Sequence, residues 1–235
     1  MGNLTKIYYR ISENSYRKEK ISTKETCLRN FLDCFDTVPI QLLCDNVSDG
    51  FYTTVKDMVQ HHNVDVYKSN VGNAGAFQLA VKSAIETLSD EHIVYLVEDD
   101  YLHMNDAKRI LEEGFSTFSN VDYLSLYDHP DKYSTLYHFG EVTKIIASRS
   151  THWKCSISTT MTFAARIKAL REDKEIWDFF TRAHHPLDHQ AFISLRKKGR
   201  ILITSIPGRS THAEPKFLSP FIDWYAIIRK YEQVG

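Results

Sequence analysis

The sequence predicts an α/β protein in which helices flank one mainly parallel central β-sheet, within a single domain. Strand-like and helix-like segments alternate through the first half of the 235 residues, which is the pattern of βαβ units. Residues 92–104, HIVYLVEDDYLHM, contain an apolar run from Ile93 to Val97. Hydrophobic residues on both faces of such a run are typical of a buried parallel strand. The length suffices for one substantial core, and no linker divides the chain.

The first half contains four predicted strands with helices between them. The strands are Lys6–Ile11, Ile40–Cys44, Val64–Tyr67 and Ile93–Val97. Ser22 with Glu25 three residues later forms a capping box, which predicts the start of the first helix. A second, short helix carries Phe51 and Val59, and the stripe from Phe77 to Leu88 predicts a third.

The second half is less regular. Predicted strands are Tyr123–Tyr127, Val142–Ser148, Ser158–Ala164 and Ile201–Thr204. Predicted helices follow Asn105, which is a helix-capping residue, and span Leu187–Lys198 and Phe221–Tyr231. The segment from Gly208 to Leu218 is predicted to be a polar loop rich in potential ligands.

Composition excludes some classes of function. The 29 basic and 30 acidic side chains nearly cancel, so bulk charge indicates neither nucleic acid nor an anionic membrane as a partner. No apolar run is long enough to cross a bilayer, so no transmembrane segment is expected. The four cysteines lack CxxC spacing and are interpreted as free intracellular thiols. We therefore expect a cytoplasmic protein, or a domain of a longer or membrane-associated one.

The apolar run ends in three adjacent acids, Glu98, Asp99 and Asp100. Adjacent carboxylates repel one another unless a cation or hydrogen-bond donors offset their charge. Hard oxygen ligands at a strand end suit Mg²⁺ or Mn²⁺ bound together with the phosphates of a substrate. The alternative is a solvated acidic turn after a core strand.

Polar residues also follow the other three predicted strands, in the order Arg10 and Ser12, then Asp45, then Asn70 and Gly72. Parallel strands that neighbour one another bring their carboxyl ends to one edge of the sheet. Open α/β sheets bind nucleotides at that edge. The sequence therefore predicts a nucleotide site there.

At this point the sequence resembles the GT-A glycosyltransferases, whose fold is Rossmann-like. The acids resemble the DXD-type motif, present here as EDD, and SNVGNAGAFQLAVKSA resembles the stretch before that motif in family-2-like members. The resemblance extends over roughly Lys6 to His212. It implies a metal-dependent glycosyltransferase of polysaccharide biosynthesis, which moves a hexosyl or related sugar from a nucleotide-diphosphate donor to a glycan or saccharide hydroxyl. UDP is the favoured nucleotide, and inversion the favoured outcome.

The resemblance assigns roles in a donor-binding half of about residues 1–104. Asp100 would ligate Mn²⁺ or Mg²⁺, Glu98 and Asp99 would lie nearer the ribose and the metal-bound waters, and Asp45 would contact the base. The remaining nucleotide-sugar residues would be Arg10, Ser12, Asn70 and Gly72.

Residues 105–235 would form the acceptor-binding half and supply the general base. In HHPLDHQAF, Asp188 resembles the acid of the family's ED-type motif. The neighbouring acid of that motif is absent, because Leu187 precedes Asp188 and His189 follows it. Asp188 is therefore either the base or only a helix cap.

The late segment GRSTHAEPKF contains His212, which sits where several GT-A enzymes place a second metal ligand. Arg209 and Lys216 are expected to close this segment, as a mobile loop, over the donor diphosphate. A solvated loop histidine is the alternative for His212.

Three further residues are candidates for acceptor binding. Tyr127 and Asp128 end a predicted strand and either line the acceptor cleft or form a plain turn. Trp153 either stacks on a sugar ring or packs in the core.

Two other functions stay open from the sequence. One is nucleotidyl transfer onto a sugar phosphate, although the first strand is not followed by the glycine-rich loop of that related fold. The other is a nucleotide- or glycan-binding domain without turnover.

Overall fold

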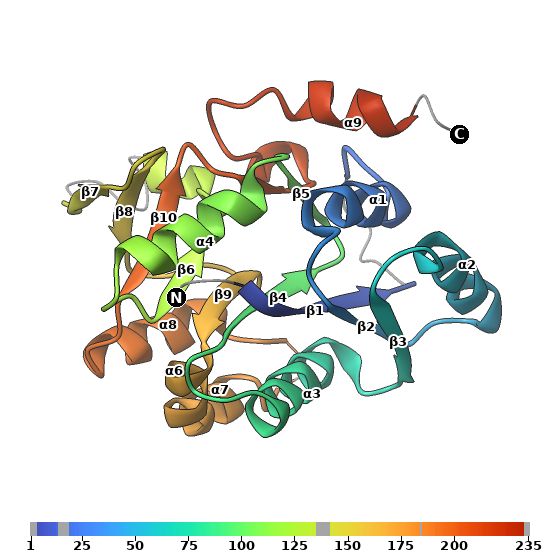
Figure 1. The fold of residues 1–235 in the computed structure, drawn as a ribbon, viewed down its shortest axis with the longest axis horizontal. Coiled ribbons are helices and arrows are strands. Elements are labelled where there is room, and N and C mark those ends of the chain that lie inside the picture. Colours follow the sequence, from blue (N-terminus) through green and yellow to red (C-terminus); the bar gives the residue numbers. More distant parts are fainter. Residues whose placement is uncertain (1–3, 14–18, 135–141, 184, 233–235) are drawn as a thin grey trace.

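The computed structural model describes residues 4–13, 19–134, 142–183 and 185–232. A central mixed β-sheet carries helices on both faces (Figure 1), as the sequence predicts. The sheet has nine strands in the order β3-β2-β1-β4-β9-β6-β10-β8-β7. These strands are β1 (Leu4–Ser12), β2 (Ile40–Asp45), β3 (Val64–Ser69), β4 (Ile93–Glu98), β6 (Tyr123–Ser125), β7 (Ile145–Ala147), β8 (His152–Ser156), β9 (Phe163–Arg166) and β10 (Leu202–Ile206).

The four amino-terminal strands are all parallel to one another. β1 lies between β2 and β4, and β2 pairs with the edge strand β3. The register aligns Ser12 with Asp45 and Arg10 with Glu98, so the carboxyl ends of these strands meet at one edge. In the other half β6 and β10 are parallel, while β9, β8 and β7 run antiparallel to their neighbours.

Helices cover the sheet on both sides. They are α1 (Lys24–Phe35), α2 (Asp49–Val59), α3 (Gly72–Thr87), α4 (Ala107–Thr117), α6 (Ile167–Glu172), α7 (Lys174–Phe180), α8 (Asp188–Lys197) and α9 (Trp224–Glu232), with short 3₁₀ turns at Pro130–Tyr133 and Pro215–Phe217. Figure 1 shows α1 and α4 on one side of the sheet and α3, α6 and α7 on the other, and α9 packs on the outer side of α1.

Successive side chains of β4 point to opposite faces of the sheet, and both faces are buried, which explains why the whole run from Ile93 to Val97 is apolar. Ile93, Tyr95 and Val97 pack in a core with residues of α1, α2 and α4. Val94 and Leu96 pack in a second core with residues of α3, α6, α7 and α8. Burying each such side chain contributes about 1.5–3 kcal/mol. Both faces of the strand are therefore held rigidly, which fixes the position of the acids that follow it.

Two predicted boundaries in this fold are wrong. The strand predicted at Ser158–Ala164 is a loop followed by β9, and β8 lies earlier in the chain. In that loop Thr160 Oγ1 accepts a hydrogen bond from the Tyr101 hydroxyl at 2.8 Å, and pairing with β4 begins only at Phe163. In addition, α1 is capped by Thr23, one residue after Ser22, whose hydroxyl accepts from the Thr26 N–H.

The segment predicted to be a mobile polar loop contains a strand, β11 (Ser210–His212). It pairs antiparallel with β5 (Tyr101–His103), the segment directly after the acids, and His212 lies opposite Tyr101. The backbone N–H of Ala213 also donates to the Asp100 carbonyl at 2.8 Å. The prediction failed because each strand has only three residues, which is too short for a recognisable hydrophobic period.

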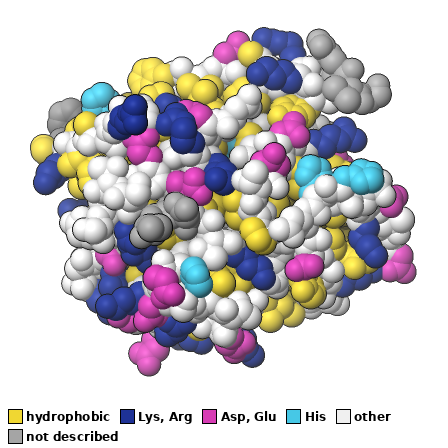
Figure 2. All heavy atoms as spheres, viewed as in Figure 1, with side chains coloured by type: hydrophobic (Ala, Val, Ile, Leu, Met, Phe, Trp, Pro, Cys, Tyr) yellow, Lys and Arg dark blue, Asp and Glu magenta, His cyan; other side chains and the backbone are white. Residues whose placement is uncertain are grey.

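The surface is mixed in charge. Figure 2 shows basic and acidic side chains interspersed over the face of the molecule that it displays. Over the part of the chain that the structure describes, no helix combines the length and apolarity needed to span a membrane. All four cysteines are free thiols, as expected, and Cys27, Cys34 and Cys44 are buried.

Candidate nucleotide and metal site

The three acids lie where β4 ends. Glu98 is the last residue of β4, and Asp99 and Asp100 form the turn that leads into β5. All three side chains are mostly buried, with exposed fractions of 22%, 13% and 20%. Removing three carboxylates from water is unfavourable unless other groups offset their charge. The surrounding cations do this.

Each acid faces a different basic side chain. Glu98 Oε1 lies 3.7 Å from Arg10 Nη2, and Asp99 Oδ2 lies 2.9 Å from the Lys24 ammonium. Asp100 Oδ2 lies 3.6 Å from the Lys20 ammonium. The solvated acidic turn that the sequence left open is therefore not what forms.

The acids differ in their proton affinity. Burial raises the pKa of Glu98 to about 7, Arg10 opposes the rise and the charge of Asp100 adds to it. Burial also raises the pKa of Asp99, against the effect of Lys24. For Asp100 burial acts in the same direction, but the hydrogen bond and charge of His212 outweigh it and lower the pKa. Asp100 therefore keeps its negative charge most firmly.

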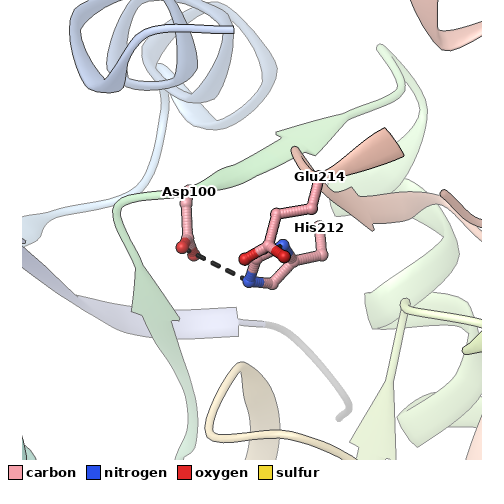
Figure 3. A group of neighbouring side chains, drawn as sticks. All are labelled: Asp100, His212 and Glu214. Carbon is pink, nitrogen blue, oxygen red and sulfur yellow. Dashed lines mark ion pairs between the residues drawn. The ribbon is translucent and has the colours of Figure 1, made fainter. Parts of the chain in front are cut away.

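A second carboxylate and an imidazole lie beside Asp100 (Figure 3). His212 Nε2 is 3.3 Å from Asp100 Oδ2, and His212 Nδ1 is 3.7 Å from Glu214 Oε1. One ligand atom from each of the three residues lies within 4.8 Å of the others. Burial lowers the pKa of His212, but the Asp100 carboxylate outweighs it, so the net pKa is raised.

This group fits a hard divalent cation. Mg²⁺ binds oxygen ligands at roughly 2.1 Å, and adjacent ligands of one ion are then about 3 Å apart. The separation of 3.3 Å between Asp100 Oδ2 and His212 Nε2 is close to that value. The two carboxylates also match the oxygen ligands that Mn²⁺ prefers. The Nε2 side of the His212 ring faces Asp100. Its buried Nδ1 faces Glu214 and forms no hydrogen bond within the described residues.

The neighbouring strand ends supply the groups expected of a nucleotide site. Asp45, at the end of β2, accepts hydrogen bonds from the Ser69 hydroxyl at 2.6 Å and from the Val71 N–H at 2.8 Å. It thereby fixes the segment in which Asn70 is exposed and Gly72 begins α3. Gly72 has φ of 78°, a left-handed conformation that glycine adopts without strain.

At the end of β1 the structure brings two more predicted residues to the acids. The Ser12 N–H donates to Asp99 Oδ2 at 2.8 Å. Arg10 is buried, and its guanidinium donates to Asn73 Oδ1 and to the Met161 carbonyl, both at 3.1 Å. Arg10 thus joins the start of α3 to the loop before β9, underneath Glu98.

Asp188 is the first residue of α8, and Leu187 occupies the capping position without a side-chain hydrogen bond. One carboxylate oxygen of Asp188 accepts from the adjacent His189 N–H at 2.7 Å. Burial raises its pKa, and the charges of His189 and His129 act in the opposite direction. The Asp188 charge in turn contributes to the raised pKa of Glu98, so the two carboxylates share one electrostatic environment.

Two predicted cations lie apart from the acids. Arg209 Nε is 3.2 Å from Asp106 Oδ1, and its Nη1 donates to the Pro207 carbonyl. The Lys216 ammonium lies over the Phe217 ring, 4.9 Å from its centre, and the side chain is exposed.

The three acceptor candidates are buried. Trp153 is fully enclosed in the core with residues of α4 and β6, and its ring N–H donates to Ser148. The Tyr127 hydroxyl donates to the Phe217 carbonyl at 2.7 Å. The Asp128 carboxylate is paired with the Lys154 ammonium and accepts from the Tyr133 hydroxyl. In this conformation the Trp153 ring has no exposed face on which a sugar can stack.

Three residues of the site were missed from the sequence. Glu214 and His212 are two apart in an extended segment, a spacing that places side chains on one side, and this signal would have found Glu214. Lys20 and Lys24 carry no such signal, because their proximity to the acids depends on how the chain returns from β1 into α1.

Comparisons with known proteins bear on the fold alone. No family model matches the sequence, and no curated protein sequence matches it. Mannosyltransferase PcManGT from Pyrobaculum calidifontis, solved with GDP-Man and Mn²⁺, superposes with a TM-score of 0.55 at 16% identity, over 85% of this chain and 54% of that one. S. aureus TarS gives 0.54 at 14% identity, over 86% and 35%.

A different kind of protein also matches. The 4-diphosphocytidyl-2C-methyl-D-erythritol synthase of Anaerococcus prevotii covers 99% of this chain and 100% of its own, at 8% identity and with a TM-score of 0.49. The chain spans about a third to a half of the length of the glycosyltransferase structures that it matches: 35% of TarS, 45% of GlyE from Streptococcus pneumoniae and 54% of PcManGT.

The similarity to these solved structures defines the fold class of this chain. This is a single α/β domain with the fold of GT-A glycosyltransferases, and the predicted fold is confirmed.

Proposed function

We propose that this protein is a metal-dependent glycosyltransferase, which transfers a sugar from a nucleotide-diphosphate donor to a hydroxyl of a glycan or other saccharide. The observation that carries the proposal is the convergence of Asp100, His212 and Glu214 at the carboxyl end of β4. Sheets of this type bind their ligands at that edge. The same fold in PcManGT was solved with GDP-Man and Mn²⁺, which supports a donor and an ion of these kinds here.

Asp100 and His212 are proposed as ligands of Mn²⁺ or Mg²⁺. When bound, the ion would neutralise charge on the departing nucleoside diphosphate. Glu98 and Asp99 are proposed to contact the ribose and metal-bound water, and Ser12 orients Asp99 through its N–H at 2.8 Å.

The nucleotide is proposed to lie along the ends of β1, β2 and β3. Arg10, Asp45, Asn70 and Gly72 form or support that surface, with Asp45 holding the turn before α3 in place. UDP remains the favoured nucleotide, and GDP is the comparison that PcManGT suggests.

Asp188 is proposed as the general base of an inverting displacement. A base must be ionised and must reach the acceptor hydroxyl, directly or through one water. Burial raises its pKa, which makes the carboxylate a stronger proton acceptor than an exposed one. The acceptor half is proposed to begin after about residue 104 and to include Tyr127 and Asp128. Arg209 and Lys216 are proposed to turn toward the diphosphate when the donor binds.

The test is nucleotide binding with and without metal. UDP and GDP are titrated into the protein by calorimetry, with Mn²⁺ present or removed by chelation, for the wild type and Asp100→Ala. We expect tight binding only for the wild type with Mn²⁺. Equal nucleotide affinity under all conditions would rule the metal site out.

Product analysis then separates the reactions. Sugar transfer releases a nucleoside diphosphate, whereas nucleotidyl transfer onto a sugar phosphate releases pyrophosphate. If the protein catalyses neither transfer nor donor hydrolysis with any of a panel of UDP- and GDP-sugars, the function that remains is that of a binding domain.

A further inference from the structure

The three acids already have their charges offset by protein cations. Arg10, Lys24 and Lys20 each face one carboxylate. A divalent ion entering this site would add positive charge beside these cations, and the most weakly held of them is the one expected to exchange its partner. The structure indicates which one, because the three are held very differently.

Arg10 and Lys24 are anchored by further hydrogen bonds. Arg10 binds Asn73 and the Met161 carbonyl, both at 3.1 Å. The Lys24 ammonium, at the start of α1, donates to the Ser12 carbonyl at 2.5 Å and to the Ser12 hydroxyl at 3.0 Å, besides its pairing with Asp99. Displacing either would leave a mostly buried cation without its partners, which is unfavourable.

Lys20 has no such anchor among the described residues. Its one ion pair is with Asp100 Oδ2, at 3.6 Å, which is longer than a hydrogen bond. The same oxygen is the one that faces His212 Nε2, and it is therefore the oxygen a metal ion would take. Lys20 thus faces the candidate metal ligand itself.

We propose that Lys20 is an exchangeable counter-ion: its ammonium pairs with Asp100 in the empty site, and with the donor diphosphate once a divalent ion has taken Asp100. This inference rests on the proposed function and names a donor-binding residue that the sequence did not indicate. The entering ion repels the ammonium, and the diphosphate supplies a negative partner within the same site. Metal and diphosphate then favour each other's binding, because each restores the charge balance that the other disturbs.

The proposal predicts opposite effects of one substitution. Lys20→Met removes the charge and keeps a flexible apolar chain. In Mn²⁺ titrations of nucleotide-free protein by calorimetry, we expect it to bind Mn²⁺ about three- to tenfold more tightly, since its competitor is gone. In pyrophosphate titrations at saturating Mg²⁺, we expect about tenfold weaker binding. Pyrophosphate carries the diphosphate charge without base or sugar, so the result does not depend on the donor's identity.

Three variants control the comparison. Lys20→Arg retains the positive charge and should stay near the wild type in both titrations. Lys82→Met removes a charge from the exposed face of α3, where Lys82 pairs with Glu86, and should change neither. Lys20→Gln is measured beside the methionine variant and is judged by the same criteria if that variant does not fold.

The outcomes are distinct. Tighter Mn²⁺ binding with weaker pyrophosphate binding supports the exchange. Unchanged Mn²⁺ affinity in both neutral variants, or weakening in both titrations, overturns it and leaves the metal site intact. Absence of Mn²⁺ binding to the wild type overturns the metal site of the proposed function, and the exchange with it.

Discussion

Replacing Asp188 by asparagine is expected to separate catalysis from folding. In the structure Asp188 begins α8, and its carboxylate accepts a hydrogen bond from the His189 N–H at 2.7 Å. The asparagine oxygen can accept the same bond. What is lost for stability is a negative charge at a helix amino terminus, which is about 0.3–1 kcal/mol. The free energy of unfolding of the variant should therefore lie within about 1 kcal/mol of that of the wild type.

The effect on transfer is expected to be much larger. A positioned general base contributes about 10²- to 10⁴-fold to the rate, which corresponds to roughly 3–5 kcal/mol of barrier. Donor binding should barely change, because Asp188 acts on the acceptor. Because burial raises its pKa, wild-type transfer should fall as the pH is lowered through that raised value and the carboxylate is protonated. The Asn variant should lack this dependence.

The assay is release of the nucleoside diphosphate across a pH series, with urea unfolding measured in parallel. Asp178→Asn is the matched control, since Asp178 is a half-exposed acid on α7 paired with Lys174. It should keep full activity. Normal turnover by a folded Asp188→Asn protein, or a product that retains the anomeric configuration of the donor, would refute the assignment, and Asp128 would be tested next.

Three further results are expected. Chelation should abolish transfer, and added Mn²⁺ should restore it. His212→Ala should need at least about tenfold more Mn²⁺ for its half-maximal rate. If the Mn²⁺ concentration at half-maximal rate is unchanged, His212 is not a ligand of the site. Asp45→Ala should lower the free energy of unfolding by about 1–3 kcal/mol and weaken nucleotide binding, because the Ser69 hydroxyl and Val71 N–H lose their acceptor. An unchanged urea midpoint together with an unchanged nucleotide affinity would contradict this. Asp173→Ala leaves the buried Tyr123 hydroxyl and the partly exposed Arg200 guanidinium without this carboxylate partner. It should lower the free energy of unfolding by about 1–3 kcal/mol without changing nucleotide affinity, and a larger effect on affinity than on stability would argue against a purely structural role.

The parallel half of the fold was predictable because its signals are local. The run from Ile93 to Val97 is apolar at every position, and the structure buries both faces of β4. Strand-then-helix alternation determines a parallel arrangement, and a parallel arrangement brings strand ends together. The meeting of Arg10, Ser12 and Asp45 with the acids at one edge follows from that reasoning without any knowledge of side-chain contacts.

The second half was less predictable because its strands are short and its pairings are distant. β8 was not predicted, and the strand that became β9 was predicted to begin at Ser158, five residues before its start at Phe163. Trp153 lay beside polar residues in the sequence, yet its ring is buried against α4. Periodicity over three to five residues does not separate these cases.

The sequence by itself determined the parallel half of the sheet, the edge at which its strands end, and the placement of Glu98, Asp99 and Asp100 at that edge. Those features depend on periodicity and on the order of strands, which are written along the chain. Only the tertiary structure decided that β11 pairs with β5 and so sets His212 and Glu214 beside Asp100, and that Lys20 offsets its charge. These contacts join residues about 80 to 110 positions apart, and their free energy comes from packing and charge that no local stretch of sequence contains.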